Sequence, residues 1–118
     1  MIDYFHQIPG LTKTNGKLSI GKKIKSISNL DEFIKIKDFK FVKNYLIKNE
    51  KTNLIKTSIT GPITLGTICA MNGVGTYYKN IRDPRIYEDI SEALGPIITR
   101  LLELGSLVQI DEPGLSGG

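Results

Sequence analysis

The chain has 118 residues and a formal net charge of +4, and it is 40% hydrophobic and 24% charged. This composition is typical of a globular domain and excludes a disordered or fibrous chain, while no run approaches the roughly 20 apolar residues of a membrane helix. The N-terminus lacks the features of a signal peptide, and the single cysteine excludes an internal disulfide. We therefore expect one cytoplasmic domain with no membrane partner.

The charge is unevenly distributed along the chain. Residues 1–56 hold 12 lysines and 5 acidic residues, whereas residues 57–118 hold 4 basic and 7 acidic residues. A basic half can be the footprint of a nucleic-acid binder. Here, however, the lysines alternate with apolar residues, as in KKIKSI and FIKIKDFKF. We interpret most of them as solvated faces of amphipathic elements, and a nucleic-acid partner is not favoured.

Residues 1–16 are rich in turn formers and are predicted to be a loop, followed by a short strand over 17–24. Asn29 with Glu32 three residues later predicts a capped helix start. Apolar residues then recur at helical spacing until the helix ends near Lys48. These residues are Ile36, Phe39, Val42 and Leu46.

The β-branched stretch 54–60 predicts a strand that stops at Gly61, and Pro62 is suited to the first position of a short helix. After a glycine-rich loop, Asp83 is expected to cap a long helix over 84–104. Gly95-Pro96 should kink this helix, and Gly105 should end it. The apolar stripe of the helix comprises Ile86, Ile90, Leu94, Ile97, Leu101 and Leu104.

The final strand, predicted over 106–112, begins with the run SLVQI, which shows no polar alternation. Such a strand is typical of a parallel sheet covered on both faces. Together with the strand at 54–60 it predicts a βαβ unit, in which both strands end at the same edge. Four residues then share the edge where α/β proteins place their sites: Thr60, Gly61, Asp111 and Glu112.

The adjacent carboxylates of Asp111 and Glu112 need an explanation, because buried charge is costly unless it is paired or used. If both residues are extended, they point to opposite sides of the strand. One interpretation is a carboxylate that binds a substrate ammonium or transfers a proton. The other is a strand-end acid that pairs with a neighbouring lysine or caps the next helix. The segment TGPITLG also has two interpretations. It is either an anion site at a helix N-terminus or a plain strand-to-helix turn.

Cys69 and His6 are the other reactive side chains. Cys69 lies in an apolar stretch and is interpreted as a small buried hydrophobe, while His6 has no visible partner. One cysteine and one histidine cannot make a structural zinc site. We expect no catalytic residue, metal ligand or cofactor within this chain.

Two motifs, KTSITGPITL (56–65) and VQIDEPGL (108–115), joined by a helix ending in LLELG, resemble the cobalamin-independent methionine synthase family. The comparison is best with its shorter, single-barrel members. The resemblance implies a (β/α)₈ barrel and methyl transfer to the thiol of homocysteine, activated by zinc. It also implies that Asp111 holds the amino group of homocysteine or methionine.

The chain departs from the family in several places. The family's zinc ligands lie beyond the IDEP strand, so the resemblance places zinc in the complete enzyme rather than here. Ile68 and Gly117 stand where folate-using members carry a tryptophan and an acid. Folate is therefore not favoured as the methyl donor, and the donor is left open. Since a barrel takes about 250 residues, residues 1–118 would supply about three to four of its eight units: a basic segment over 1–53 and a βαβ unit over 54–118.

The expected function is therefore part of a methionine-synthase-like methyltransferase that contributes to the homocysteine pocket and is inactive alone. The alternative is a non-catalytic module, either a subunit of a split barrel or a small basic nucleic-acid binder. Open strand edges favour a homo-oligomer or a partner chain that completes the barrel.

Overall fold

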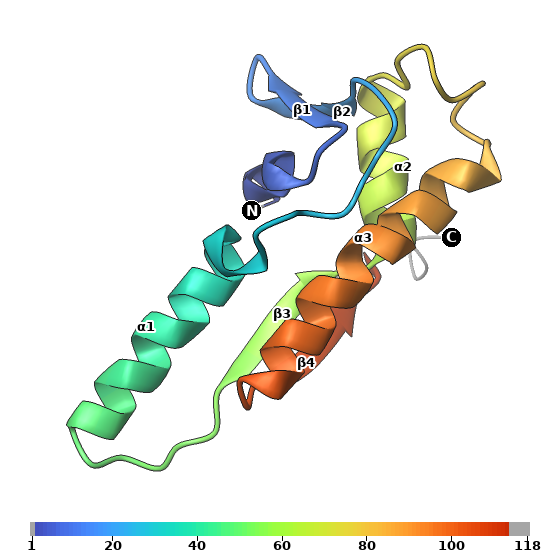
Figure 1. The fold of residues 1–118 in the computed structure, drawn as a ribbon. Coiled ribbons are helices and arrows are strands. Elements are labelled where there is room, and N and C mark those ends of the chain that lie inside the picture. The colour runs from blue at the N-terminus through green and yellow to red at the C-terminus, as the bar shows by residue number, and fades with distance from the viewer. Residues whose placement is uncertain (1, 114–118) are drawn as a thin grey trace.

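The computed structural model describes residues 2–113. The molecule is elongated, measuring 51 × 30 × 25 Å. One end holds a small hairpin and the other end holds a long helix beside a pair of parallel strands (Figure 1). None of the helices in this part of the chain is both long and apolar enough to cross a membrane.

The N-terminal region is not the loop that we predicted. A short 3-10 helix over Asp3–Gln7 leads into an antiparallel hairpin of β1 (Leu11–Thr14) and β2 (Lys17–Ile20). Asn15 and Gly16 form its turn with positive φ angles of 53° and 77°, which is the geometry that an Asn-Gly pair favours in two-residue hairpins.

The helix α1 (Ile34–Lys48) ends where predicted, but its start is different. Asn29 makes no side-chain capping bond. Instead, the backbone N–H of Ile34 donates to the Gln7 Oε1 atom over 2.9 Å. The cap therefore comes from a residue far away in the sequence, which a local pattern does not reveal.

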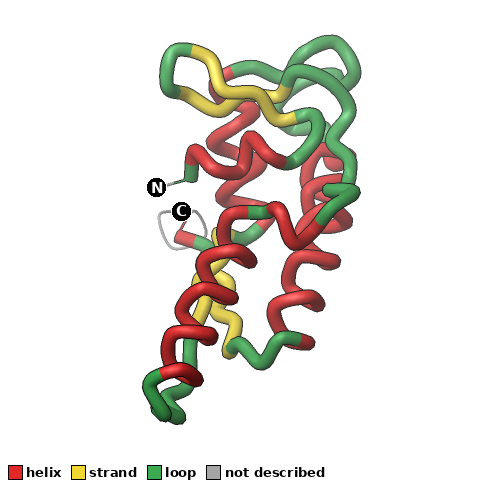
Figure 2. The backbone as a smooth tube through the Cα atoms, turned by 60° about the vertical axis from the view of Figure 1, so that its left-hand side comes forward, coloured by secondary structure: helices red, strands yellow, loops and turns green. Residues whose placement is uncertain are grey.

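The apolar stripe of α1 is buried only near its start. Ile36 and Phe39 are buried, whereas Val42 is 41% exposed. Figure 2 shows the far half of this helix projecting from the body of the molecule. Asp31 ties the near end down, because its carboxylate binds Lys40 and the guanidinium of Arg100.

The C-terminal half has the predicted order of elements. It comprises β3 (Lys56–Thr60), α2 (Pro62–Asn72), α3 (Pro84–Glu103) and β4 (Leu107–Asp111). The two strands pair in parallel. The chain is thus an α/β protein with a parallel sheet, as the sequence predicted.

The long helix α3 supplies much of the core. Asp83 caps it, because its Oδ1 atom accepts from the backbone N–H of Arg85 over 3.0 Å. The helix continues through Pro96 without a break. Gly105 follows its end with a φ of 98°. Its buried stripe comprises Ile86, Ile90, Leu94, Ile97 and Leu101, with Leu104 partly buried.

The strand β4 is not covered on both faces, contrary to our prediction. Leu107 and Ile110 are each 51% exposed. Within residues 2–113, β3 and β4 form a two-stranded sheet. The apolar run in β4 therefore has too few neighbouring elements here to bury it.

Candidate functional site

The two strand ends meet as the sequence predicted. Thr60 is the register partner of Asp111 in the parallel pair. One residue later, the Gly61 N–H donates to the Asp111 carbonyl oxygen over 2.7 Å. Because α2 begins at Pro62, this sheet edge also carries the N-terminus of that helix (Figure 1).

Strand alternation separates the two faces of this small sheet. Thr57 and Ile59 are buried, whereas Ser58 and Thr60 are half-buried. Side chains of paired residues in a parallel sheet emerge on the same face. Asp111 therefore shares a more open, polar face with Ser58 and Thr60.

The side chain of Asp111 belongs to a short polar chain on that face. Its Oδ1 atom accepts from Gln109 Nε2 over 2.6 Å, and Gln109 Oε1 accepts from Lys56 Nζ over 2.9 Å. Among residues 2–113, no cationic group lies within ion-pair distance of Asp111. A neutral amide thus orients the carboxylate, and its charge remains available to an external cation.

Glu112 contacts a different group. Its Oε2 atom accepts from the backbone N–H of Ile63 over 3.1 Å, and its Oε1 atom accepts from that of Thr64 over 2.8 Å. These are orphan donors in the first turn of α2, where negative charge is favoured. Glu112 therefore caps α2, which precedes it in the chain, rather than the next helix that the sequence analysis considered.

Gly61 packs against the side chain of Glu112. Its φ of −74° is available to any residue, so glycine is not needed for its conformation. A Cβ atom at this position would lie only 2.6 Å from the Glu112 Cγ atom. The missing side chain of Gly61 makes room for Glu112, a contact that sequence reasoning missed.

Cys69 and His6 do not join this site. Cys69 is fully buried, and this burial raises the pKa of its thiol to about 12. The thiol therefore stays protonated at neutral pH and is a poor nucleophile. His6 is exposed, and its Nδ1 atom lies 2.8 Å from the Asp3 carbonyl oxygen.

The described residues do not fit the zinc set that the resemblance implies for the complete enzyme. Between residues 2 and 113, no three His, Cys, Asp or Glu side chains are grouped to hold a metal ion. Gly117, which bears on the choice of methyl donor, lies outside the described residues.

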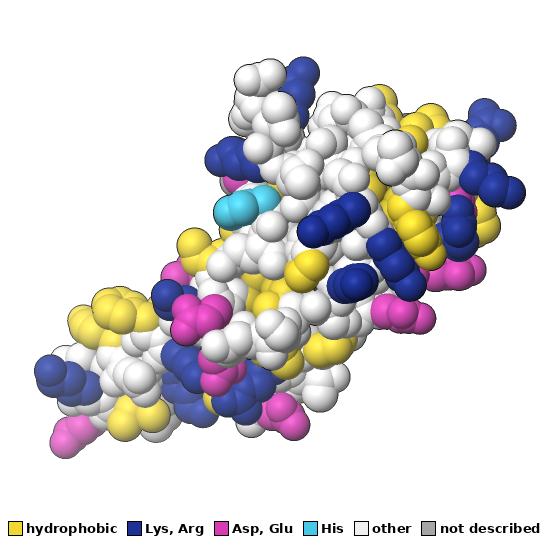
Figure 3. All heavy atoms as spheres, turned by 45° about the horizontal axis from the view of Figure 1, so that its top comes forward, with side chains coloured by type: hydrophobic (Ala, Val, Ile, Leu, Met, Phe, Trp, Pro, Cys, Tyr) yellow, Lys and Arg dark blue, Asp and Glu magenta, His cyan; other side chains and the backbone are white. Residues whose placement is uncertain are grey.

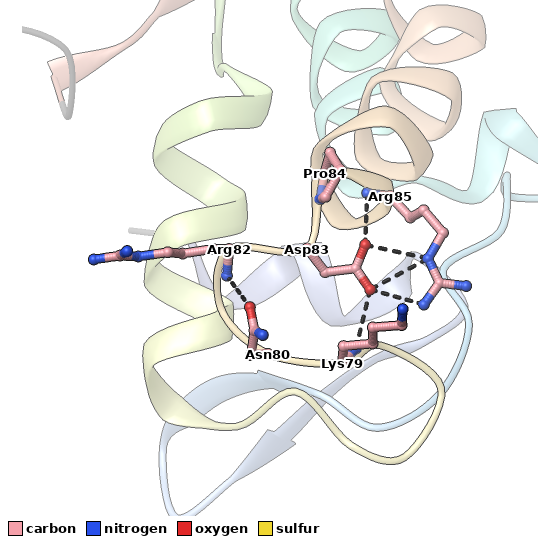
Figure 4. Close-up of a pocket in the computed structure, with 6 residues that line it drawn as sticks. All are labelled: Lys79, Asn80, Arg82, Asp83, Pro84 and Arg85. Atoms are coloured by element: carbon pink, nitrogen blue, oxygen red, sulfur yellow. Dashed lines mark hydrogen bonds and ion pairs between the residues drawn. The ribbon is translucent and has the colours of Figure 1, made fainter.

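A hollow of about 580 Å³ borders the start of α3 (Figure 4). The Asp83 carboxylate lies against it and accepts from the backbone N–H groups of Lys79 and Arg85, each over 3.0 Å. The Arg85 guanidinium binds the same carboxylate over 2.7 Å and holds its pKa well below the usual range. Since these donors satisfy both oxygens, Asp83 is a helix cap rather than a candidate acid or base.

A comparison with curated proteins found a similarity to a methionine synthase of Methanocaldococcus jannaschii. The two are 36% identical over 90 residues, which cover 74% of this chain and 28% of the synthase. The chain thus spans less than a third of the length of that relative. No family profile matches the chain, and no solved structure matches it. The likeness supports a distant and partial relationship to methionine synthases.

Proposed function

We propose that this chain is part of a methionine-synthase-like methyltransferase and forms one side of its homocysteine pocket. The observation that carries the proposal is the position of Asp111, beside Thr60 and Gly61 at the carboxyl edge of a parallel strand pair. Sites of α/β barrels are built at this edge. The partial likeness to a methionine synthase supports the same assignment.

In this proposal, Asp111 accepts hydrogen bonds from the ammonium group of homocysteine. Gln109 holds the carboxylate through the 2.6 Å bond to Oδ1. Glu112 is a positioning residue, because it fixes the first turn of α2 against the same edge. We assign no step of the methyl transfer itself to these residues. Thiol activation by zinc and the choice of methyl donor belong to the complete enzyme.

The proposal also includes a (β/α)₈ barrel of which this chain supplies a part. Leu107 and Ile110 are half-exposed on β4, and the described sheet has two strands. Exposed apolar surface and open strand edges favour pairing with further strands. We propose that a second copy or a partner chain supplies them.

A graft tests the proposal. The stretch of the Methanocaldococcus jannaschii synthase that matches this chain is replaced by the corresponding residues of this chain, and methionine formation is measured. We expect the graft to form methionine and the isolated chain to form none. A graft that folds, with a cooperative melt, but forms no methionine would contradict the proposal.

A further inference from the structure

A second hollow lies far from the Asp111 edge, between the segment that follows β2 and the loop that follows α2. Its volume is about 530 Å³. The residues that line it are Pro9, Lys22, Lys23, Lys25, Thr76 and Tyr77. Three of these six residues are lysines and none is acidic. The hollow, which we call the lysine pocket, therefore has a basic lining.

The backbone under these lysines is fixed. Ile24 is buried, and its N–H donates to the Tyr78 hydroxyl over 2.9 Å. The Lys25 N–H donates to the Pro9 carbonyl oxygen over 2.9 Å. A Cβ atom on Gly75 would lie 2.8 Å from the Gly21 carbonyl oxygen, so the two segments pack closely. The backbone that carries the three lysines is therefore already ordered, which lowers the entropy cost of binding a ligand.

The lysines of this pocket have no acidic partner in the described chain. Lys13, Lys37 and Lys40 each form an ion pair elsewhere. Between residues 2 and 113, no such pair is made by Lys22 or Lys25. Figure 3 shows dark-blue side chains gathered over this part of the molecule.

The third lysine and the nearby charged groups do not neutralise the pocket. Lys23 Nζ lies 5.7 Å from the centre of the Tyr77 ring, which is a cation–π contact. The Asp89 carboxylate accepts from the Tyr78 hydroxyl over 2.7 Å. Arg85 lies over the same Tyr77 ring but is bound to Asp83. Among the described residues, neither Asp83 nor Asp89 forms an ion pair with these three lysines.

We propose that the lysine pocket binds a small molecule that carries two linked phosphate groups. A phosphate group carries more negative charge at neutral pH than a carboxylate does, so two linked phosphate groups can offset three ammonium groups, which a single carboxylate cannot. The Thr76 hydroxyl offers a further donor at the rim. The pocket and the Asp111 edge lie beyond opposite ends of α2, whose 11 residues span about 16 Å at 1.5 Å per residue.

The first experiment titrates inorganic pyrophosphate into the full chain and follows backbone amide signals by NMR. We expect saturable shifts at residues 22–25 and at Thr76 and Tyr77. Shifts that are absent, or spread evenly over all lysines, would overturn the proposal.

The second experiment compares two triple variants with the same change in charge. The pocket variant carries Lys22→Gln, Lys23→Gln and Lys25→Gln. The control variant carries Lys17→Gln, Lys48→Gln and Lys51→Gln, all exposed positions outside the pocket. Since one charge-assisted hydrogen bond is worth roughly a factor of ten in affinity, we expect the pocket variant to bind pyrophosphate at least tenfold more weakly and the control to bind nearly as well as the wild type.

Equal weakening in both variants would show general electrostatic attraction and overturn the proposal. Binding of a single-stranded oligonucleotide without any binding of pyrophosphate would overturn it as well, because it would indicate an extended anion. If the pocket variant fails to fold, the location of the shifts in the wild-type chain decides the question.

Discussion

The charged side chains near the two ends of α2 differ in whether they have partners within the chain. At its N-terminus, the Glu112 carboxylate accepts hydrogen bonds from the backbone N–H groups of Ile63 and Thr64. Beyond its C-terminus, Lys22 and Lys25 face a hollow that contains no acidic side chain. A charge that the chain satisfies internally holds the fold together, whereas a charge that it leaves unsatisfied is available to a ligand.

The same distinction separates two neighbouring residues. Glu112 is used within the chain, while Asp111 is held by the amide of Gln109 and meets no cation in the described structure. Substitutions at the internally satisfied end of α2 should therefore change stability. Substitutions at Asp111 or in the lysine pocket should change binding.

Gly61→Ala should have the largest effect on stability. The new Cβ atom would crowd the end of the Glu112 side chain, and moving that side chain aside removes its cap on α2, which costs about 0.5–2 kcal/mol. Gly95→Ala is the matched control, because nothing lies within 4 Å of a Cβ atom there; in a helix this change should stabilise the chain by about 0.5–1 kcal/mol. Chemical denaturation measures both.

A double variant sharpens this prediction. In a Glu112→Ala background the crowding group is gone, so Gly61→Ala should cost less than it does in the wild type. Equal costs in the two backgrounds would mean that the two residues are not coupled. The proposed role of Gly61, which is to make room for Glu112, would then be wrong.

Glu112→Gln should have a smaller effect. The amide keeps one acceptor but turns its NH₂ group toward a backbone donor, and loss of a capping interaction costs about 1 kcal/mol. Glu50→Gln, at an exposed position, should leave the free energy of unfolding unchanged. A melting temperature of Glu112→Gln equal to that of the wild type would show that the cap contributes nothing.

Acid should weaken the fold gradually through Asp83. Arg85 lowers the pKa of this carboxyl below its unfolded value, so its contribution is present above about pH 4 and is lost as the pH falls toward the folded pKa. Asp83→Asn should therefore flatten the dependence of stability on pH below about pH 4. Identical profiles for wild type and Asp83→Asn would contradict this assignment.

The sequence predicted those features that depend on local pattern. The start of α2 and the Asp83 cap follow from residues within a few positions of each other, and the parallel pair follows from the order of a strand, a helix and a second strand. The features that it missed depend on distant partners. Ile34 is capped by Gln7, which is 27 residues away, and the space for Glu112 is provided by Gly61, which no periodicity connects to it.

The run KKIKSI shows what the pattern does and does not predict. Its lysines are exposed and Ile24 is buried, as the solvated-face interpretation predicted, but the run is not a regular element, because β2 ends at Ile20. The Ile20 N–H donates to the Gly73 carbonyl oxygen and the Gly21 N–H donates to that of Gly10, each over 2.8 Å. These bonds direct the chain into an irregular segment, where strand alternation no longer applies and Lys22 and Lys23 line one hollow.

The most direct test of the central claim is homocysteine binding by the grafted enzyme that carries either Asp111→Asn or Glu112→Gln. Removing the charge opposite the substrate ammonium should weaken binding about ten- to a hundredfold, since a charge-assisted hydrogen bond is worth about 1.5–3 kcal/mol. The melting temperature of the Asp111→Asn graft should not change, whereas Glu112→Gln should lower it and leave affinity nearly intact. Calorimetric titration showing unaltered homocysteine affinity in Asp111→Asn would contradict the account.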